Sequence, residues 1–288
     1  MPPTVSLRHQ TTYRYDQPVA LGPHYVRLAP APQTRIPFRD YRLEVRPSSH
    51  LLHWMFGPAG NRVARIVFPD RIDRLDLTVT MTVTLTPLNP FDFFVEPWAL
   101  TTPFDYDDHH RRPLQPYLAP DHAGPLLSAW LETIDRTPRN TVEFLVDLNK
   151  RLADTIAYST RWEPGVQTSE QTLEIKIGSC RDTSMLLVQI LRHLGFASRF
   201  VSGYLIQLKN DQPDSPKEDT LDLHAWAEAF VPGAGWLGMD PTSGMMASEG
   251  HIPLAAAVDP MDTAPVIGSA SEVESQFQHQ MSIERLTS

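Results

Sequence analysis

The one cysteine of this 288-residue chain, Cys180, is the first candidate for chemistry. It follows Gly178-Ser179 and precedes apolar residues at helical spacing, so the sequence predicts that it lies in the first turn of a helix. The unpaired N–H groups and the dipole of a helix N-terminus favour a thiolate, and the N–H groups can also bind an oxyanion. A lone cysteine is more often a small buried apolar residue, so its position alone leaves both roles open.

His224 and Asp240 are the candidate partners, because a thiol nucleophile needs a base and the base needs an orienting group. His224 lies in a predicted strand, 223–231, in which residues 223, 225, 227 and 229 are leucine or alanine. Asp240 ends the next predicted strand, and residues 232–235 (Pro-Gly-Ala-Gly) predict a hairpin that brings its carboxylate near the imidazole. The alternative is that Asp240 only terminates its strand before a turn.

Other residues around Cys180 are candidates for contact with a substrate or its oxyanion. Ser179 and Arg181 flank the cysteine, and Arg181 suits either a substrate carboxylate or a packing role. Asp182 is favourable with the helix dipole. Trp162 is a candidate for the substrate cleft. Trp226 is either a polar neighbour of His224 or, in the interpretation we favour, a core residue.

The spacing of apolar residues changes along the chain and indicates which helices and strands position these candidates. Residues 122–288 are expected to form the α+β core, because predicted helices are followed by predicted strands rather than alternating with them. Helices are predicted over residues 125–134, 141–156 and 179–194, and strands over residues 199–208, 223–231 and 236–239. The polar segment 209–220 is expected to be a mobile loop, residues 253–270 are expected to be irregular, and residues 274–283 to form a last strand.

The first third of the chain has a different character. Of the 27 prolines, 18 lie at or before Pro125, which disfavours helices there. Alternating segments at residues 41–45, 62–68 and 75–85 predict a small antiparallel β-sandwich over residues 1–95, with a barrel as the alternative. Residues 96–121, which include His109 and His110, are interpreted as a surface linker. The histidine pair could bind a metal, but a solvated loop is the favoured interpretation.

Composition excludes several classes of protein. One cysteine rules out an intramolecular disulfide and any zinc site with several thiolates from one chain. A net charge of −9 argues against an extended nucleic-acid surface. The first ten residues lack the apolar segment of a signal peptide, and no apolar run is long enough to span a membrane. We therefore expect a cytoplasmic protein that binds neither nucleic acid nor membrane, and edge strands leave open a homo-oligomer.

Together these blocks of sequence resemble the bacterial transglutaminase-like superfamily. The resemblance rests on four blocks in the expected order: GSCRD (178–182), RFVSGY (199–204), HAWAE (224–228) and WLGMDPT (236–242). The N-terminal region is similar to the β domain that precedes this core in many bacterial members, with TYRY at residues 12–15 followed by Pro18-Val19.

The resemblance implies a papain-like α+β core in which a helix carrying Cys180 packs on an antiparallel sheet. It also implies a Cys180–His224–Asp240 triad that cleaves peptide or isopeptide amides through a thioester. Bacterial proteins of this kind are usually described as cysteine proteases, so we favour hydrolysis, with transfer of the acyl group to an amine as the alternative. A non-catalytic binding module is the alternative from a different class. We expect no cofactor, and a metal held by the same three residues is the weakest interpretation.

Overall fold

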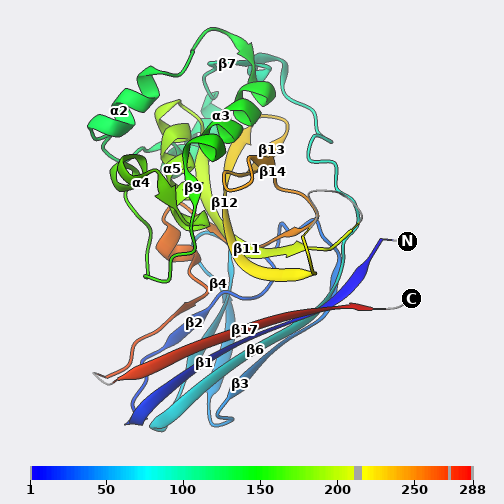
Figure 1. Cartoon of the computed structure of the whole chain (residues 1–288), viewed down its shortest axis with the longest axis vertical. Helices are drawn as coiled ribbons and strands as arrows, with labels where there is room; N and C mark the ends of the chain where they lie inside the picture. The colour runs from blue at the N-terminus through cyan, green and yellow to red at the C-terminus, as the bar shows by residue number, and fades with distance from the viewer. Residues whose placement is uncertain (1, 211–215, 272–273, 287–288) are drawn as a thin grey trace.

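The computed structural model describes residues 2–210, 216–271 and 274–286. The chain is α+β, with two four-stranded antiparallel sheets at one end and a five-stranded sheet covered by helices at the other (Figure 1). This is the fold class that the sequence predicts. The last strand pairs along its whole length with residues 4–15 of the first strand, and Thr4 lies opposite Leu286, so the two ends of the described chain are neighbours.

The N-terminal sheets confirm the predicted β-sandwich. The strand order is β17-β1-β6-β3 in one sheet and β16-β2-β5-β4 in the other. The alternation predicted for residues 75–85 is seen in β6, where the odd-numbered side chains from Leu75 to Val83 are buried. The strands are β1 (Thr4–Val19), β2 (His24–Val26), β3 (Phe38–Arg46), β4 (Leu51–Phe56), β5 (Arg62–Val67), β6 (Ile72–Thr84), β16 (Val266–Ile267) and β17 (Ser275–Leu286).

Two of these strands come from the C-terminal end of the chain. The sequence assigns all of residues 122–288 to the core, but β17 pairs with β1 and β16 pairs with β2. Local alternation identifies residues 274–283 as a strand without showing which strand edge it joins, because pairing partners are far apart in sequence. The N-terminal β region is therefore completed by β16 and β17.

The core sheet has the order β14-β13-β12-β11-β15, and α5 packs on β11 and β12 (Figure 1). Ala225, Ala227 and Ala229 of β12 are buried in the cluster that includes Leu187 and Leu191 of α5, and their small side chains let the helix approach closely. The bounds are α2 (Pro125–Glu132), α3 (Thr141–Thr155), α4 (Ser169–Ile175), α5 (Cys180–His193), β11 (Ser198–Gln207), β12 (Thr220–Val231), β13 (Gly235–Asp240), β14 (Met245–Met246) and β15 (His251–Ala257).

Several segments differ from the sequence prediction. Residues 96–121 contain a helix, α1 (Asp108–Leu118), whose N-cap Asp107 accepts a hydrogen bond from the backbone N–H of His110, so the segment is more than a linker. The sequence did not predict this helix, because Pro113 and Pro116 lie inside it and proline disfavours a helix interior. The segment expected to be irregular, 253–270, includes most of β15. The remaining short elements are η1 (Pro97–Ala99), β7 (Thr101–Thr102), β8 (Arg139–Asn140), β9 (Ala157–Tyr158), β10 (Ile177–Gly178) and η2 (Pro260–Thr263).

The loop expected at residues 209–220 lies partly outside the described residues, since residues 211–215 are not described. On its described side, Asp219 pairs with Arg285 of β17. Among the described residues, no helix is both long and apolar enough to cross a membrane.

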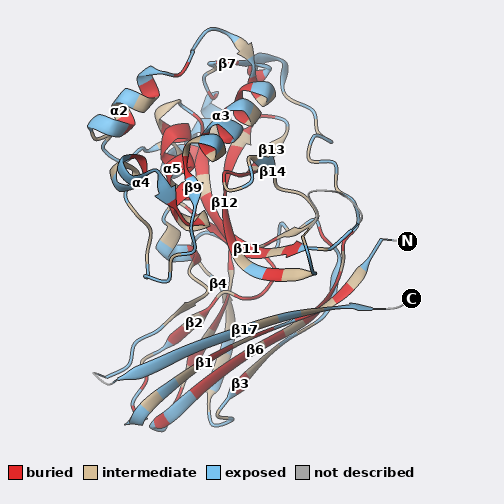
Figure 2. Cartoon of the chain, viewed as in Figure 1, coloured by how far each residue is buried: buried red, intermediate tan, exposed pale blue. Residues whose placement is uncertain are grey.

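One apolar cluster joins the β-sandwich to the core sheet. Tyr204, Ile206 and Ile252 of the core belong to the same buried cluster as Leu7 and Leu75 of the sandwich. Figure 2 shows this buried interior running from β1 and β6 up into β11 and β12. The sheet that carries His224 therefore rests on the N-terminal region.

Candidate active site

Cys180 is the first residue of α5, as the sequence predicts, and it is half-buried. Ser179 is the N-cap, and the Asp182 carboxylate accepts hydrogen bonds from its backbone N–H (2.9 Å) and its hydroxyl (2.7 Å). This carboxylate in the first turn also lies at the positive end of the helix dipole. The thiol is thus presented by a helix start whose backbone is fixed.

Asp182 does more than complement the helix dipole. Its fully buried carboxylate accepts hydrogen bonds from Nε (3.0 Å) and Nη2 (2.9 Å) of Arg161 and from the backbone N–H of Gln167 (2.7 Å). Burial raises the pKa of Asp182, but these hydrogen bonds and those from Ser179 outweigh it and lower the pKa to about 2. Asp182 therefore ties the segment 161–167 to the start of α5.

Arg181 holds the same segment. Its Nη2 donates to the backbone carbonyls of Arg161 and Glu163, each at 2.9 Å. Between those carbonyls lies Trp162, whose side chain is 73% exposed and whose ring centroid is 5.5 Å from that of His279 on β17. The contacts of Arg181 support the packing role that the sequence left open, and they fix the backbone beside an exposed tryptophan.

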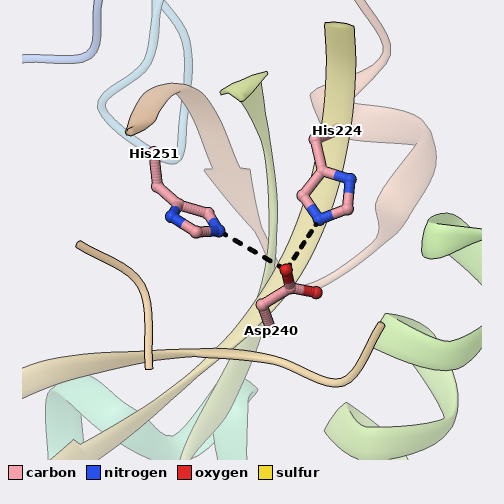
Figure 3. A group of neighbouring side chains, drawn as sticks. All are labelled: His224, Asp240 and His251. Carbon is pink, nitrogen blue, oxygen red and sulfur yellow. Dashed lines mark ion pairs between the residues drawn. The ribbon is translucent and has the colours of Figure 1, made fainter. Parts of the chain in front are cut away.

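His224 and Asp240 meet across the hairpin of β12 and β13 (Figure 3). Nε2 of His224 lies 3.1 Å from Oδ2 of Asp240, and both side chains are buried. Asp240 also accepts hydrogen bonds from the backbone N–H of Thr242 (2.9 Å) and the hydroxyl of Ser243 (3.0 Å). The sequence predicted this pair correctly because the turn at residues 232–235 sets the two strands side by side.

A second histidine, His251, reaches the same carboxylate (Figure 3). Its Nε2 lies 3.5 Å from Oδ2 of Asp240. Neither histidine Nε2 has a well-aligned hydrogen bond, so both contacts with Asp240 are close polar contacts, at 3.1 and 3.5 Å. Nothing in the sequence singles out His251, because no strand is predicted at its position and no motif surrounds it.

The electrostatics of the site link the thiol, the imidazole and the carboxylate. Burial lowers the pKa of His224, but interactions with Asp240 and Cys180 outweigh this and raise the pKa to about 10. Burial raises the pKa of Asp240, but His224 and His251 hold it well below its usual range. Because Nε2 of His224 faces Asp240, Nδ1 is the ring nitrogen left for Cys180. The arrangement favours a charged imidazolium beside an ionised carboxylate.

Trp226 is buried, which agrees with the core role that we favoured. Its ring lies edge-on to His251, with centroids 5.2 Å apart. A Cβ on Gly203 of the neighbouring strand would come 2.5 Å from the tryptophan ring, so only glycine leaves room for it there. Trp226 therefore contacts the candidate site through the ring of His251.

The one group of described residues with metal-ligand spacing consists of His224, Asp240 and His251, whose ligand atoms all lie within 4.8 Å of one another. A metal-binding imidazole must present a bare nitrogen. Nδ1 of His251 accepts a hydrogen bond from the backbone N–H of Ser248 (3.3 Å), which leaves the ring proton on Nε2, the nitrogen that faces Asp240. These contacts suit a carboxylate with two imidazole neighbours better than a metal ion.

A groove of about 600 Å³ opens between the segment that carries Trp162 and the N-terminal sheet. Its lining is mixed, with an aromatic side formed by Trp162, Phe277 and His279 and a polar side that includes two arginines. The lining residues are Gln10, Thr12, Arg14, Arg74, Trp162, Phe277, Gln278, His279 and Gln280.

Curated relatives of this chain are bacterial. An uncharacterised protein of Mycobacterium tuberculosis (strain H37Rv) is 32% identical over 138 residues, which cover 45% of this chain and 42% of that protein. The chain thus spans less than half the length of that relative. An uncharacterised protein of Mycobacterium leprae is 27% identical over 271 residues, 90% of each chain.

A solved structure shares the fold. A protein from Cytophaga hutchinsonii, described as a "putative cysteine protease", superposes with a TM-score of 0.71 at 17% identity, covering 100% of this chain and 92% of that one. At this identity the likeness concerns the fold.

Two family descriptions match the sequence itself. Residues 5–84 match the "bacterial transglutaminase-like N-terminal region", and residues 128–241 match the "transglutaminase-like superfamily". The second match contains Cys180, His224 and Asp240. The chain therefore joins a bacterial transglutaminase-like N-terminal region to a core of the transglutaminase-like superfamily.

Proposed function

We propose that the chain is a cysteine-dependent hydrolase of peptide or isopeptide amide bonds. The observation that carries the proposal is the position of His224, which interacts with Cys180 on one side and lies 3.1 Å from Asp240 on the other. An imidazole between a thiol and a buried carboxylate is the arrangement that activates a nucleophile and then protonates its leaving group.

The proposed reaction has two halves. Sγ of Cys180, its proton held by His224, forms a bond to the amide carbonyl carbon, and the backbone N–H of Cys180 stabilises the oxyanion. The C–N bond then breaks, His224 gives its proton to the departing amine, and a thioester remains. In the second half a water oxygen bonds to the thioester carbon and its proton passes to His224. The C–S bond then breaks, His224 returns a proton to Sγ of Cys180, and the carboxylic acid leaves.

Asp240 keeps the imidazole in the required orientation and balances the charge of the imidazolium. His224 is 8% exposed and Asp240 is 3% exposed at the side chain, so water screens their interaction little. We propose no cofactor for this reaction, because His224 is the donor or the acceptor in each proton transfer.

The substrate side is expected at Trp162. Arg181 and Asp182, which directly follow the nucleophile, hold the backbone on both sides of this exposed tryptophan. The groove beside it combines an aromatic wall with three glutamine side chains, which suits the apolar side chains and the backbone amides of an extended peptide. Trp162→Ala is therefore expected to raise KM more than it lowers kcat.

The rate at which iodoacetamide alkylates Cys180 tests the proposal. In a chain with one thiol, this rate is measured directly by mass spectrometry. We expect wild-type Cys180 at neutral pH to react about tenfold or more faster than free cysteine, and His224→Ala to remove that advantage. A rate equal to that of free cysteine and indifferent to His224 would overturn the proposal and favour a binding module.

Trapping of the acyl-enzyme separates the remaining alternatives. Wild type incubated with peptide amides is expected to carry an acyl group on Cys180, whereas Cys180→Ala is not. Release of this group as a free acid supports hydrolysis, and its transfer to an added primary amine in preference to water identifies the acyl transferase instead.

A further inference from the structure

The contact between His251 and Asp240 is the strongest feature that the proposed function leaves unused. His251 is outside the four sequence blocks, its side chain is 8% exposed, and its Nε2 lies 3.5 Å from the carboxylate oxygen that also faces His224. A buried imidazole directed at a buried carboxylate needs a physical reason, because burial of polar groups is costly without compensation.

The backbone fixes the position of His251. It is the first residue of β15. In this strand His251 lies opposite Leu205 of β11, and Ile252 lies opposite Tyr204 of β11. The strand β11 is the neighbour of β12, which carries His224. The turn before it is closed by two hydrogen bonds. The N–H of His251 donates to the carbonyl of Ser248 (2.9 Å), and the N–H of Ser248 donates to Nδ1 of His251 (3.3 Å). The imidazole is therefore anchored at its far nitrogen.

This anchor determines the tautomer. A ring nitrogen that accepts a hydrogen bond carries no proton, so the proton of a neutral His251 is on Nε2. That is the nitrogen that faces Asp240, and the edge-on contact with Trp226 keeps the ring from turning away. His251 is thus presented to the carboxylate as a neutral donor.

Asp240 then has three fixed neighbours besides His224. The backbone N–H of Thr242 donates to Oδ1, and the hydroxyl of Ser243 and the imidazole of His251 lie at Oδ2, at 3.0 and 3.5 Å. Because Oδ2 is also the oxygen nearest to His224, any group that fixes Oδ2 fixes the direction in which the carboxylate pulls on the catalytic imidazole.

We propose that His251 is a positioning residue, which holds Oδ2 of Asp240 through a neutral imidazole protonated on Nε2 and so orients His224. The inference rests on the proposed function, since orientation of His224 matters only if it serves Cys180. His251 touches neither thiol nor substrate, so its loss is expected to lower the rate of the chemical step and to leave substrate binding unchanged.

Two variants of His251 separate positioning from folding. His251→Phe keeps a ring against Trp226 and removes the donor, while His251→Gln keeps an N–H donor near the place of Nε2. We expect His251→Phe to lower kcat and the alkylation rate of Cys180 about tenfold with KM unchanged, and His251→Gln to recover most of the loss. His53→Phe, at an exposed histidine of β4, is the matched control.

Nitrogen-15 NMR of the imidazoles tests the tautomer without any substrate. The signals that His251→Gln removes belong to His251, and at neutral pH they are expected to show a protonated Nε2 and a bare Nδ1. A proton on Nδ1, or equal rates for wild type and His251→Phe, would overturn the inference.

The two proposals fail in different ways. An unreactive wild-type Cys180 contradicts the proposed function. The NMR measurement still shows which nitrogen of His251 carries the proton that faces Asp240. A reactive Cys180 that depends on His224 but ignores His251→Phe contradicts this inference alone. If His251→Phe does not fold, the alkylation rate of Cys180 in His251→Gln and the nitrogen-15 signals of His251 decide whether His251 positions Asp240.

Discussion

His224 and Asp240 show how burial and pairing oppose each other at single residues. Burial by itself makes both charged forms unfavourable, because each loses its hydration. The short contact between them reverses the outcome, so the pKa of His224 rises to about 10 and the pKa of Asp240 falls well below its usual range. Each group is charged because the other one is, and loss of either leaves a buried charge without its partner.

This coupling predicts the titration of His224. Its folded pKa of about 10 is above the ordinary histidine value of 6.5, so the imidazolium contributes stability that is complete below pH 6.5 and is lost as pH rises through about 10. NMR of the His224 imidazole should show a protonated ring at pH 8 in the wild type. In Asp240→Asn the ring should lose its proton at a lower pH. An unchanged midpoint would contradict the role given to Asp240.

The start of α5 is held in place by a segment that lies well before it in the chain. The fully buried Asp182 carboxylate joins Ser179, in front of the nucleophile, to Arg161 and Gln167. The helix dipole explains why an acid is favourable in this turn, and the pairing of this buried carboxylate with the partly buried Arg161 explains why the acid is needed there.

Asp182→Asn is therefore expected to destabilise the fold by about 3 kcal/mol, because it leaves Arg161 without its buried charged partner and with only the exposed carboxylate of Glu163, 3.9 Å away. The folded pKa of Asp182, about 2, lies below the unfolded value of 3.8. Its stabilisation is therefore present above pH 3.8 and is lost as pH falls through about 2. Urea unfolding at pH 7 measures the loss. Asp154→Asn, which removes an exposed pair with Lys150 on α3, is the control and should cost less than 1 kcal/mol. Equal losses of unfolding free energy in Asp182→Asn and Asp154→Asn would contradict the structural role given to Asp182.

What the sequence reveals about these elements depends on whether the signal is local. The helix start at Cys180 and the hairpin that joins His224 to Asp240 are local, since a glycine-serine cap and a four-residue turn encode them, and both were predicted correctly. The residues that reach the site from distant parts of the sequence were not predicted. Arg161 and His251 reach the site only through tertiary packing, and nothing in their neighbouring residues indicates it.

The N-terminal region supports the sheet of the candidate site. Tyr204 of β11 is buried in the cluster shared with the sandwich, and its neighbour Gly203 lies opposite His224. The hydroxyl of Tyr204 lies 2.9 Å from Nδ1 of His9 on β1, and Nε2 of His9 lies 3.1 Å from the hydroxyl of Thr11. A buried histidine thus stands where the two parts of the chain meet.

This histidine predicts how acid affects the junction. Burial, with a smaller contribution from the charge of His279, lowers the pKa of His9 to about 4, below its unfolded value of 6.5. The unfolded chain therefore binds a proton between pH 6.5 and 4 that the folded chain does not, so stability is complete above pH 6.5 and falls as pH drops toward 4. The expected loss from His9 is about 2 kcal/mol between pH 7.5 and 4.5.

His9→Gln removes the titrating group from this junction and leaves the other buried histidines, such as His24, in place. Wild type should therefore lose about 2 kcal/mol more than His9→Gln when urea unfolding at pH 7.5 is compared with unfolding at pH 4.5. His53→Gln, at an exposed position of β4, should behave as wild type. Because the junction supports the strand beside His224, the alkylation rate of Cys180 should also be less sensitive to acid in His9→Gln. Identical acid losses in the three proteins would mean that protonation of His9 does not loosen the two parts of the chain.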